Sequence, residues 1–218
     1  MTLTQDLANF RQQFLDNADK ETIAVMNRAT DNLANSGITE QTLKIGQKAP
    51  NFKLTNATGN TVELKELLKQ GAVVISFYRG GWCPYCNLEL RALQQFLPEI
   101  KALGANLVAI SPETPDNSLS TTEKNELTFE VLSDVGNKTA REYGLVFTLP
   151  QELRPIYEGF NIDIPAHNGD DTFELPIPAT YVIAPNGTVI HAFANPDYTQ
   201  RLDPTEIITA LKNQSITA

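Results

Sequence analysis

The chain has 218 residues, of which 41% are hydrophobic and 20% are charged, and its net charge is −9. This balance is typical of a globular protein with one large core, and the negative charge argues against binding to nucleic acid or to an anionic membrane. The longest apolar runs are too short to span a bilayer, and the first twenty residues show no apolar signal segment. We therefore expect a cytoplasmic protein.

Residues 1–44 are predicted to form a helical extension. Apolar residues recur at helical spacing between residues 3 and 14, and a second stripe runs through residues 23–33. Residues 35–37, Asn-Ser-Gly, are suited to ending the second helix. We expect a helical hairpin packed on the main domain. A dimerisation arm, and with it a homodimer, is the alternative.

Residues 45–218 are predicted to form one α/β domain with a central mixed sheet. Buried strands alternate with helices, which indicates a mostly parallel sheet covered on both faces. The turn at residues 185–187, Pro-Asn-Gly, joins the last two strands into a hairpin at one edge. Asp203 is suited to capping a final helix that begins at Pro204. Five prolines break the pattern at about 147–178, which predicts a long, functional insertion.

The only two cysteines, Cys83 and Cys86, lie between the apolar run of residues 72–78 and a helical pattern that begins at Asn87. Amide groups and the dipole at a helix N-terminus favour a thiolate. Structural zinc is an unfavourable alternative, because it needs about four ligands, no second cysteine pair exists, and the only histidines are His167 and His191. We interpret the pair as redox-active. The alternative is that both cysteines are buried and unreactive. We expect no cofactor.

Three residues apart, the two sulfurs lie on one helix face about a turn apart and can form a disulfide. Cys83 is nearer to the open amide groups, so we expect it to be more exposed and its pKa to be lowered. Cys86 should be better shielded. Tyr85, between them, is expected to be exposed and to meet the partner.

Neighbouring side chains are candidates for supporting roles. Arg79 could lower a thiolate pKa or form a surface ion pair. Glu89 could take up protons, hold Arg79 or Arg91, or simply be solvated. Trp82 is expected to shield the sulfurs. His167, in the insertion, could reach the site as a general base, although a loop histidine is usually solvated.

Three segments carry a family resemblance: residues 49–54, the strand end Phe77-Tyr78, and residues 131–144. They resemble the peroxiredoxins of the alkyl hydroperoxide reductase/thiol-specific antioxidant family, over about residues 45–211. The likeness is strongest to a divergent branch with a C-x-x-C motif. It implies a thioredoxin-like fold and reduction of hydroperoxides through a cysteine thiolate. Thioredoxin, glutaredoxin or glutathione would be the reductant.

In the family pattern P-x-x-x-T-x-x-C-x-x-E, the reactive cysteine corresponds to Cys86 and the glutamate to Glu89. Cys83 replaces the threonine and Arg79 replaces the proline. The family's second arginine falls near Pro178 and is missing there. In the family, the threonine and the arginine orient the peroxide and stabilise charge as its O–O bond breaks.

Two further features resemble thioredoxins and glutaredoxins. Cys-Pro-Tyr-Cys matches the glutaredoxin motif, and Pro178-Ala179-Thr180 resembles the cis-proline segment beside the active cysteines. By thioredoxin logic Cys83 attacks first, and by peroxiredoxin logic Cys86 does. The leading hypothesis is a thiol peroxidase with a Cys83/Cys86 disulfide cycle. A thiol–disulfide oxidoreductase and a non-enzymatic redox sensor are the alternatives.

Overall fold

Strand β3 (Ala72–Phe77) lies in the interior of the sheet, and all six of its residues are buried. In the computed structural model, which describes residues 2–217 except the side chains of 215–217, β3 pairs in parallel with β4 (Ala105–Ser111). It pairs antiparallel with β8 (Ala179–Ile183). The strand order is β2-β1-β5-β4-β3-β8-β9. The remaining strands are β1 (Lys53–Asn56), β2 (Thr61–Glu63), β5 (Glu130–Ser133) and β9 (Val189–Ala194).

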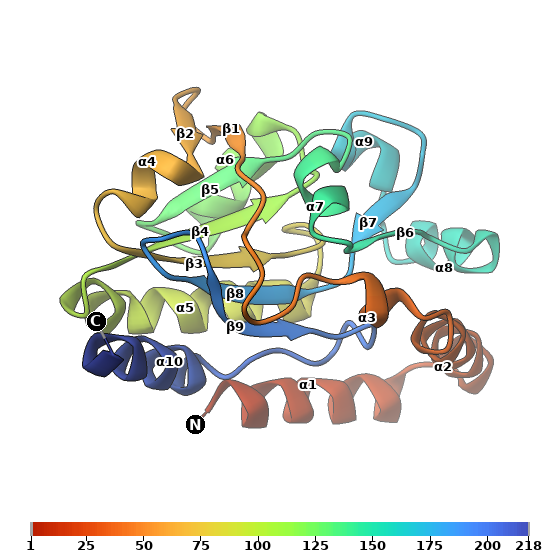
Figure 1. Cartoon of the computed structure of the whole chain (residues 1–218). Coiled ribbons are helices and arrows are strands. Elements are labelled where there is room, and N and C mark those ends of the chain that lie inside the picture. Colours follow the sequence, from red (N-terminus) through yellow and green to blue (C-terminus); the bar gives the residue numbers. More distant parts are fainter. Residues whose placement is uncertain (1, 218) are drawn as a thin grey trace.

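Helices cover both faces of this mixed sheet (Figure 1). Alternate residues of β3 enter two different cores, as the period-two geometry of a strand requires. The first core is shared with α1 (Leu3–Asn17), α5 (Pro84–Ala102) and α10 (Pro204–Thr217). The second is shared with α3 (Ile38–Gln41), α4 (Leu64–Leu68) and α7 (Lys138–Glu142). The predicted α/β architecture, with a mixed sheet covered on both faces, is confirmed. The expectation of a mostly parallel sheet was wrong: β4 is parallel to β3 and β5, whereas β1–β2, β1–β5, β3–β8 and β8–β9 are antiparallel.

The first two helices, together called the N-terminal hairpin below, pack on the rest of the chain but run in different directions and enter different cores (Figure 1). α1 begins with a capping box between Thr2 and Gln5, and α2 (Lys20–Ala34) is capped by Asp19. Leu3 and Leu7 of α1 are buried in the core that contains α5. The apolar stripes read from the sequence therefore face the protein, as the packed-hairpin interpretation predicted.

The segment 147–178 is more regular than the sequence indicated. It contains a 3-10 turn (Gln151–Leu153), α8 (Arg154–Gly159), α9 (Ile164–Asn168) and a two-stranded sheet of β6 (Val146–Thr148) and β7 (Glu174–Pro176). The prolines do break the segment into short elements, as expected, but two of them also open α8 and α9 in their first turns, where a missing amide hydrogen costs nothing. A third core joins this segment to α2.

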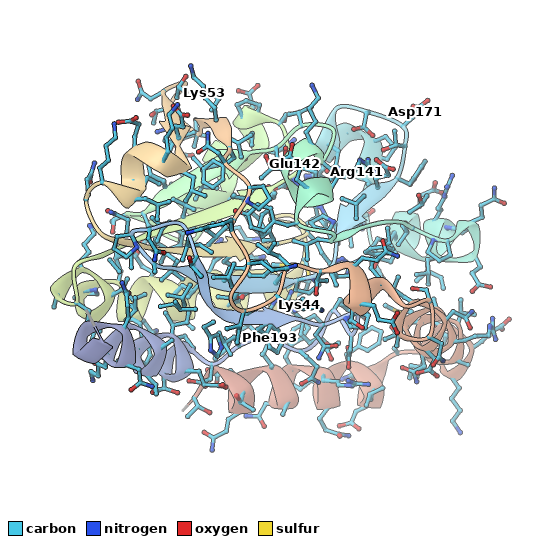
Figure 2. The ribbon with its side chains drawn as sticks, viewed as in Figure 1. Lys44, Lys53, Arg141, Glu142, Asp171 and Phe193 are labelled. Atoms are coloured by element: carbon cyan, nitrogen blue, oxygen red, sulfur yellow. The ribbon has the colours of Figure 1, made fainter. Side chains whose placement is uncertain are left out.

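Two further sequence predictions agree with the structure. β8 and β9 form the expected hairpin at a sheet edge. Asp203 accepts a hydrogen bond from the Thr205 amide at 3.2 Å and caps α10. The remaining helix, α6 (Pro115–Lys124), also begins with a proline. Charged side chains such as Lys53 and Asp171 lie at the periphery (Figure 2). Within the described part of the chain, no helix is long and apolar enough to cross a membrane.

Candidate active site

Both cysteines lie at the turn between β3 and α5, as predicted. Cys83 is the N-cap of α5, Pro84 takes the first helical position, and Cys86 lies in the first turn. Both are free thiols, and their exposed fractions are only 1% and 0%. Cys83 was expected to be more exposed than Cys86, but the two are almost equally buried because other parts of the chain cover this turn.

Arg201 connects Cys86 with Glu89 in the interior. Its Nη2 donates to the Cys86 Sγ at 3.1 Å, and its Nε donates to the Glu89 Oε2 at 2.6 Å. The side chains of Arg201 and Glu89 are 0% and 1% exposed. Thr180, on β8, donates to the other oxygen of Glu89 at 3.4 Å. Glu89 therefore holds neither of the arginines that the sequence suggested.

Sequence reasoning missed Arg201 because it sits 115 residues from Cys86 in the chain. The search for a second arginine was confined to the family position near Pro178, where none occurs. Arg201 instead enters from the segment before α10, and two carbonyl oxygens, of Tyr198 and Gln200, accept hydrogen bonds from its Nη1. The one local signal that could have drawn attention to Arg201 is its position two residues before Asp203, which caps α10.

The two cysteines differ in acidity. Burial favours the neutral thiol of Cys83, but a hydrogen bond from Cys86 and the charges of Arg79 and Arg201 outweigh burial and lower the pKa of Cys83 to about 6. Burial, the hydrogen bond donated to Cys83 and the charge of that neighbour raise the pKa of Cys86. Of the two thiols, Cys83 is therefore the more acidic.

Glu89 is poised to exchange a proton near neutral pH. Burial raises its pKa to about 7, although the positive charge of Arg201 opposes the shift. Because Arg201 contacts both Glu89 and Cys86, the carboxyl group and the less acidic thiol share one buried guanidinium.

Arg79 is buried in an aromatic cage. Its exposed fraction is 2%, and its guanidinium carbon lies 5.0 Å, 5.5 Å and 4.7 Å from the ring centres of Trp82, Tyr157 and Tyr198. It donates a hydrogen bond to the Tyr157 hydroxyl, while its Nε has no partner. The alternative of a surface ion pair was wrong: within residues 2–217 no carboxylate pairs with Arg79.

Tyr85 is buried, so its predicted exposure was also wrong. Phe10 of α1 meets its ring edge-on at a centroid distance of 5.1 Å, and Tyr198 meets it at 5.6 Å. The N-terminal hairpin therefore covers the cysteine turn. Arg11 of α1 stabilises this packing with hydrogen bonds to Asp197 at 3.0 Å and to Thr199 at 2.9 Å.

The comparison with cis-proline proteins fails at one point. The described residues contain no cis peptide bond, so the bond before Pro178 is trans. Pro178 instead lines a cavity together with Arg79, while Thr180 reaches Glu89. The trans bond fits the sheet register, in which Ala179 pairs with Phe77 at the start of β8.

A buried carboxylate, Glu113, holds the loop before the cysteines. It is 1% exposed, accepts a hydrogen bond from the Gly81 amide at 2.9 Å and another from the Thr121 hydroxyl at 3.4 Å. His167 lies 3.1 Å from its other oxygen, so this histidine reaches Glu113 and is not a solvated loop residue. No pattern near Glu113 marked it in the sequence.

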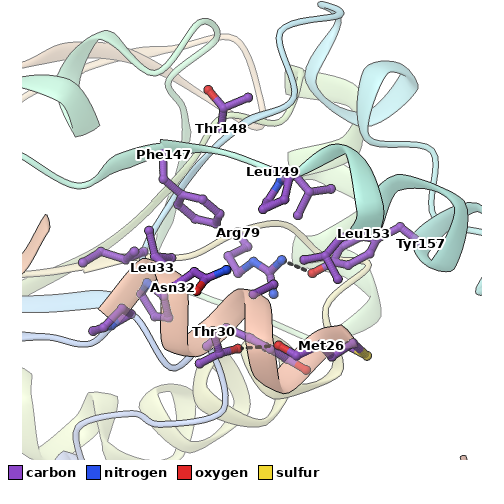
Figure 3. Close-up of a pocket in the computed structure, with 16 residues that line it drawn as sticks. Met26, Thr30, Asn32, Leu33, Arg79, Phe147, Thr148, Leu149, Leu153 and Tyr157 are labelled. Atoms are coloured by element: carbon purple, nitrogen blue, oxygen red, sulfur yellow. Dashed lines mark hydrogen bonds between the residues drawn. The ribbon is translucent and has the colours of Figure 1, made fainter. Parts of the chain in front are cut away.

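Two cavities meet at Arg79. The cysteine cavity, about 290 Å³, lies between the N-terminal hairpin and the cysteine turn and is lined by Cys83 but not by Cys86. The hairpin cavity, about 230 Å³, lies between α2 and residues 147–157 (Figure 3). Both are lined by Met26, Arg79, Tyr157 and Tyr198, and most of their lining is apolar.

Comparisons with known proteins agree with this geometry. Residues 45–192 match the AhpC/TSA family. A thiol-disulfide oxidoreductase ResA of Bacillus thuringiensis is 31% identical over 108 residues, which are 49% of this chain and 61% of that protein. A chloroplastic peroxiredoxin Q of Gentiana triflora is 32% identical over 145 residues, 66% of this chain and 56% of that protein. The chain thus spans about 61% of the length of the first of these relatives.

Solved structures show the same fold. Peroxidoxin BcpB from Mycobacterium tuberculosis superposes with a TM-score of 0.62 at 20% identity, covering 78% of this chain and 97% of that one. A peroxiredoxin-like protein from Aquifex aeolicus gives 0.62 at 16% identity, covering 79% and 88%. Helices α1 and α2 lie before the matched residues 45–192, so the hairpin that covers the cysteines is outside the family match.

Proposed function

Since the chain belongs to the AhpC/TSA family, we propose that it is a thiol-dependent peroxidase in which Cys83 attacks a hydroperoxide and Cys86 resolves the product. The observation that carries this assignment is that Cys83 lines the cysteine cavity and Cys86 does not. The acidity of the pair supports the same order, because the lowered pKa belongs to the cysteine that faces the cavity. A thiolate, and not a thiol, is the nucleophile.

In the first step, the Cys83 thiolate attacks the terminal oxygen of the hydroperoxide. A sulfur–oxygen bond forms with the electron pair of the sulfur, the O–O bond breaks, and an alkoxide or hydroxide leaves and takes up a proton. Cys83 becomes a sulfenic acid. Arg79 contributes fixed positive charge beside the cavity, where negative charge develops on the leaving oxygen.

In the second step, Cys86 loses its proton and attacks the sulfur of the Cys83 sulfenic acid. The S–S bond forms, the S–O bond breaks, and hydroxide leaves and is protonated to water. We assign Glu89 as the acceptor of the Cys86 proton, because its raised pKa of about 7 suits proton transfer near neutrality. Arg201 would stabilise the thiolate while it forms.

An external thiol must then return the disulfide to two thiols. Thioredoxin, glutaredoxin or glutathione can each supply the two electrons. Because both sulfurs are almost fully buried, the reductant needs the N-terminal hairpin or the loop 195–199 to move aside.

A thiol–disulfide oxidoreductase is the second candidate. The match to ResA and an acidic cysteine at a helix N-cap favour it. The 1% exposure of Cys83 disfavours a protein disulfide as substrate, because sulfur must meet sulfur in line, whereas a small peroxide fits the cavity.

Stopped-flow fluorescence separates the two, because the single tryptophan, Trp82, lines the cysteine cavity. The reduced protein is mixed with hydrogen peroxide, with tert-butyl hydroperoxide and with a glutathione mixed disulfide. We expect a second-order rate with a peroxide at least about a hundredfold above that of free cysteine at the same pH. A peroxide rate equal to that of free cysteine, with rapid reaction of the mixed disulfide, would replace the peroxidase by the oxidoreductase. Silence in all three would leave a redox sensor.

A further inference from the structure

Arg79 is a buried cation that pairs with no carboxylate in the described part of the chain, and it stands at the junction of two mostly apolar cavities. Its Nε has no hydrogen-bond acceptor, although only 2% of the residue is exposed. A buried charge left in this way is costly unless an anion completes it. Figure 3 shows the guanidinium between α2 and the segment that contains Leu149 and Leu153.

The walls on either side indicate what kind of anion fits. The hairpin cavity is lined by aliphatic and aromatic side chains from both the hairpin and the 147–178 segment, namely Met26, Ala29, Leu33, Phe147, Leu149 and Leu153. Among the residues that the structure describes, no other lysine, arginine or histidine lines either cavity. A ligand with one negative group and an apolar tail would satisfy both features, whereas a polyanion would not.

We propose that the hairpin cavity binds an apolar monocarboxylate, whose carboxylate pairs with Arg79 and whose hydrocarbon chain lies against α2 and residues 147–153. A carboxylate matches the planar guanidinium fork through charge-assisted hydrogen bonds. The 147–178 segment, with no assigned role so far, thereby acquires one: it forms the outer wall of this site.

Binding at Arg79 should depend on the redox state. In the reduced protein the Cys83 thiolate partly balances the charge of Arg79, and a Cys83–Cys86 disulfide removes that negative charge. The oxidised protein should therefore bind the carboxylate more tightly, and by linkage the bound carboxylate should disfavour the Cys83 thiolate. Only this redox dependence rests on the proposed function. The site itself does not.

The first test is a titration of the wild-type protein followed by Trp82 fluorescence and by calorimetry. Octanoate is compared with 1-octanol, which has the same chain and no charge. We expect octanoate to bind at least about tenfold more tightly, since hydrogen bonds to charged groups are the stronger kind. Equal affinity for the acid and the alcohol would overturn the proposal without any mutant.

Variants then locate the carboxylate. Arg79→Met should abolish the preference for octanoate over octanol, and Arg79→Lys should restore part of it. Arg154→Met is the matched control: Arg154 belongs to the same segment but stacks on Phe173 at 3.8 Å and lines neither cavity. Circular dichroism verifies that each variant folds. An unchanged preference in folded Arg79→Met would contradict the proposal.

The redox arm uses Cys83→Ser, which removes the thiolate without forming a disulfide. Its affinity for octanoate should equal that of the oxidised wild type and exceed that of the reduced wild type at pH 8. Identical affinities in all three would overturn the redox linkage, even if the protein reduces peroxides efficiently. Conversely, a protein without peroxidase activity can still pass the octanoate–octanol test, so the two proposals fail separately.

The carboxylate has two sources, a separate anion or the head of a hydroperoxide substrate. Turnover of a fatty-acid hydroperoxide is compared with that of its methyl ester. A higher kcat/KM for the acid that Arg79→Met removes assigns the site to substrate. Inhibition of tert-butyl hydroperoxide turnover by octanoate, with no acid preference, assigns it to a separate ligand. Both results require the site. If octanoate does not inhibit and the acid is not preferred, no carboxylate acts there.

Discussion

Arg201 donates a hydrogen bond to the Cys86 sulfur at 3.1 Å while it forms an ion pair with Glu89 at 2.6 Å. The arrangement places a cation against the less acidic cysteine of the pair. It also fixes the position of Glu89, which among the described residues is the only carboxylate that pairs with Arg201. Arg201 thereby holds the first turns of α5 against the segment before α10, so its removal should affect both the stability of the fold and the chemistry of Cys86.

Removing Arg201 should destabilise the protein strongly. In Arg201→Met, Glu89 would remain buried without its charged partner, which typically costs about 3–5 kcal/mol. Urea denaturation monitored by circular dichroism measures the free energy of unfolding. Lys212→Met is the control, because its ion pair with Glu99 is exposed and should change stability by less than about 1 kcal/mol. Equal losses in the two variants would show that the buried pair contributes nothing particular.

The reactivity of Cys83 should follow a titration near pH 6. Its pKa is lowered to about 6, so the thiolate fraction, and with it the rate of alkylation by iodoacetamide, should rise as pH increases through that value. Cys86→Ala removes a hydrogen bond to Cys83 and should move the midpoint upward, while Cys86→Ser keeps a donor and should move it less.

A direct measurement of thiolate ionisation checks this prediction independently. The absorbance of the thiolate near 240 nm, recorded between pH 4 and 10, reports the same titration without a reagent. A midpoint near 9, the ordinary value for a cysteine thiol, would contradict the acidity assigned to Cys83.

The N-terminal hairpin should control access to the cysteines. Arg11 bonds to Asp197 and Thr199 and ties α1 over Tyr85. In Arg11→Met we expect the thiol reagent dithiobis(nitrobenzoate) to react with Cys83 several-fold faster, because α1 moves away from the cysteine turn more often. Arg28→Met is the matched control on the same hairpin, since Arg28 forms an exposed pair with Glu152 at 3.6 Å. Equal reactivity of both variants and the wild type would mean that the hairpin is no barrier.

Gly81 should tolerate no side chain. A Cβ there would lie 2.0 Å from the Thr121 hydroxyl oxygen, so the loop before the cysteines or α6 would have to shift. Gly81→Ala should cost about 1–3 kcal/mol of unfolding free energy and slow the peroxide reaction. Adding Thr121→Ala should recover part of both. Gly159→Ala, where a Cβ meets nothing within 4 Å, should be nearly neutral.

Local patterns in the sequence predicted the fold and the cysteine turn, whereas long-range contacts were out of reach. The apolar run of β3 and the helical spacing after Cys86 placed both sulfurs at a strand-to-helix turn. Glu89 followed from its spacing to Cys86, but its partner Arg201 lies 112 residues away. Tyr85 looked exposed because nothing local indicated that Phe10 would cover it.

Side chains that the tertiary structure buries against expectation explain the other errors. From the sequence, Arg79 could serve the cysteines or lie in a surface ion pair; the rings of nearby Trp82 and of the distant Tyr157 and Tyr198 enclose it in the interior. The prolines of the 147–178 segment read as breaks, although two of them begin short helices. In both cases the residue type allowed two outcomes, and packing between remote parts of the chain selected one.

The most direct test of the account is to find which cysteine is oxidised first. Cys86→Ser and Cys83→Ser are each treated with one equivalent of hydroperoxide in the presence of dimedone, which traps sulfenic acid, and the peptides are analysed by mass spectrometry. We predict that Cys86→Ser consumes the peroxide and carries dimedone on Cys83, while Cys83→Ser reacts no faster than a free thiol. Rapid oxidation of Cys86 in Cys83→Ser, with Cys83 inert in Cys86→Ser, would contradict the assignment.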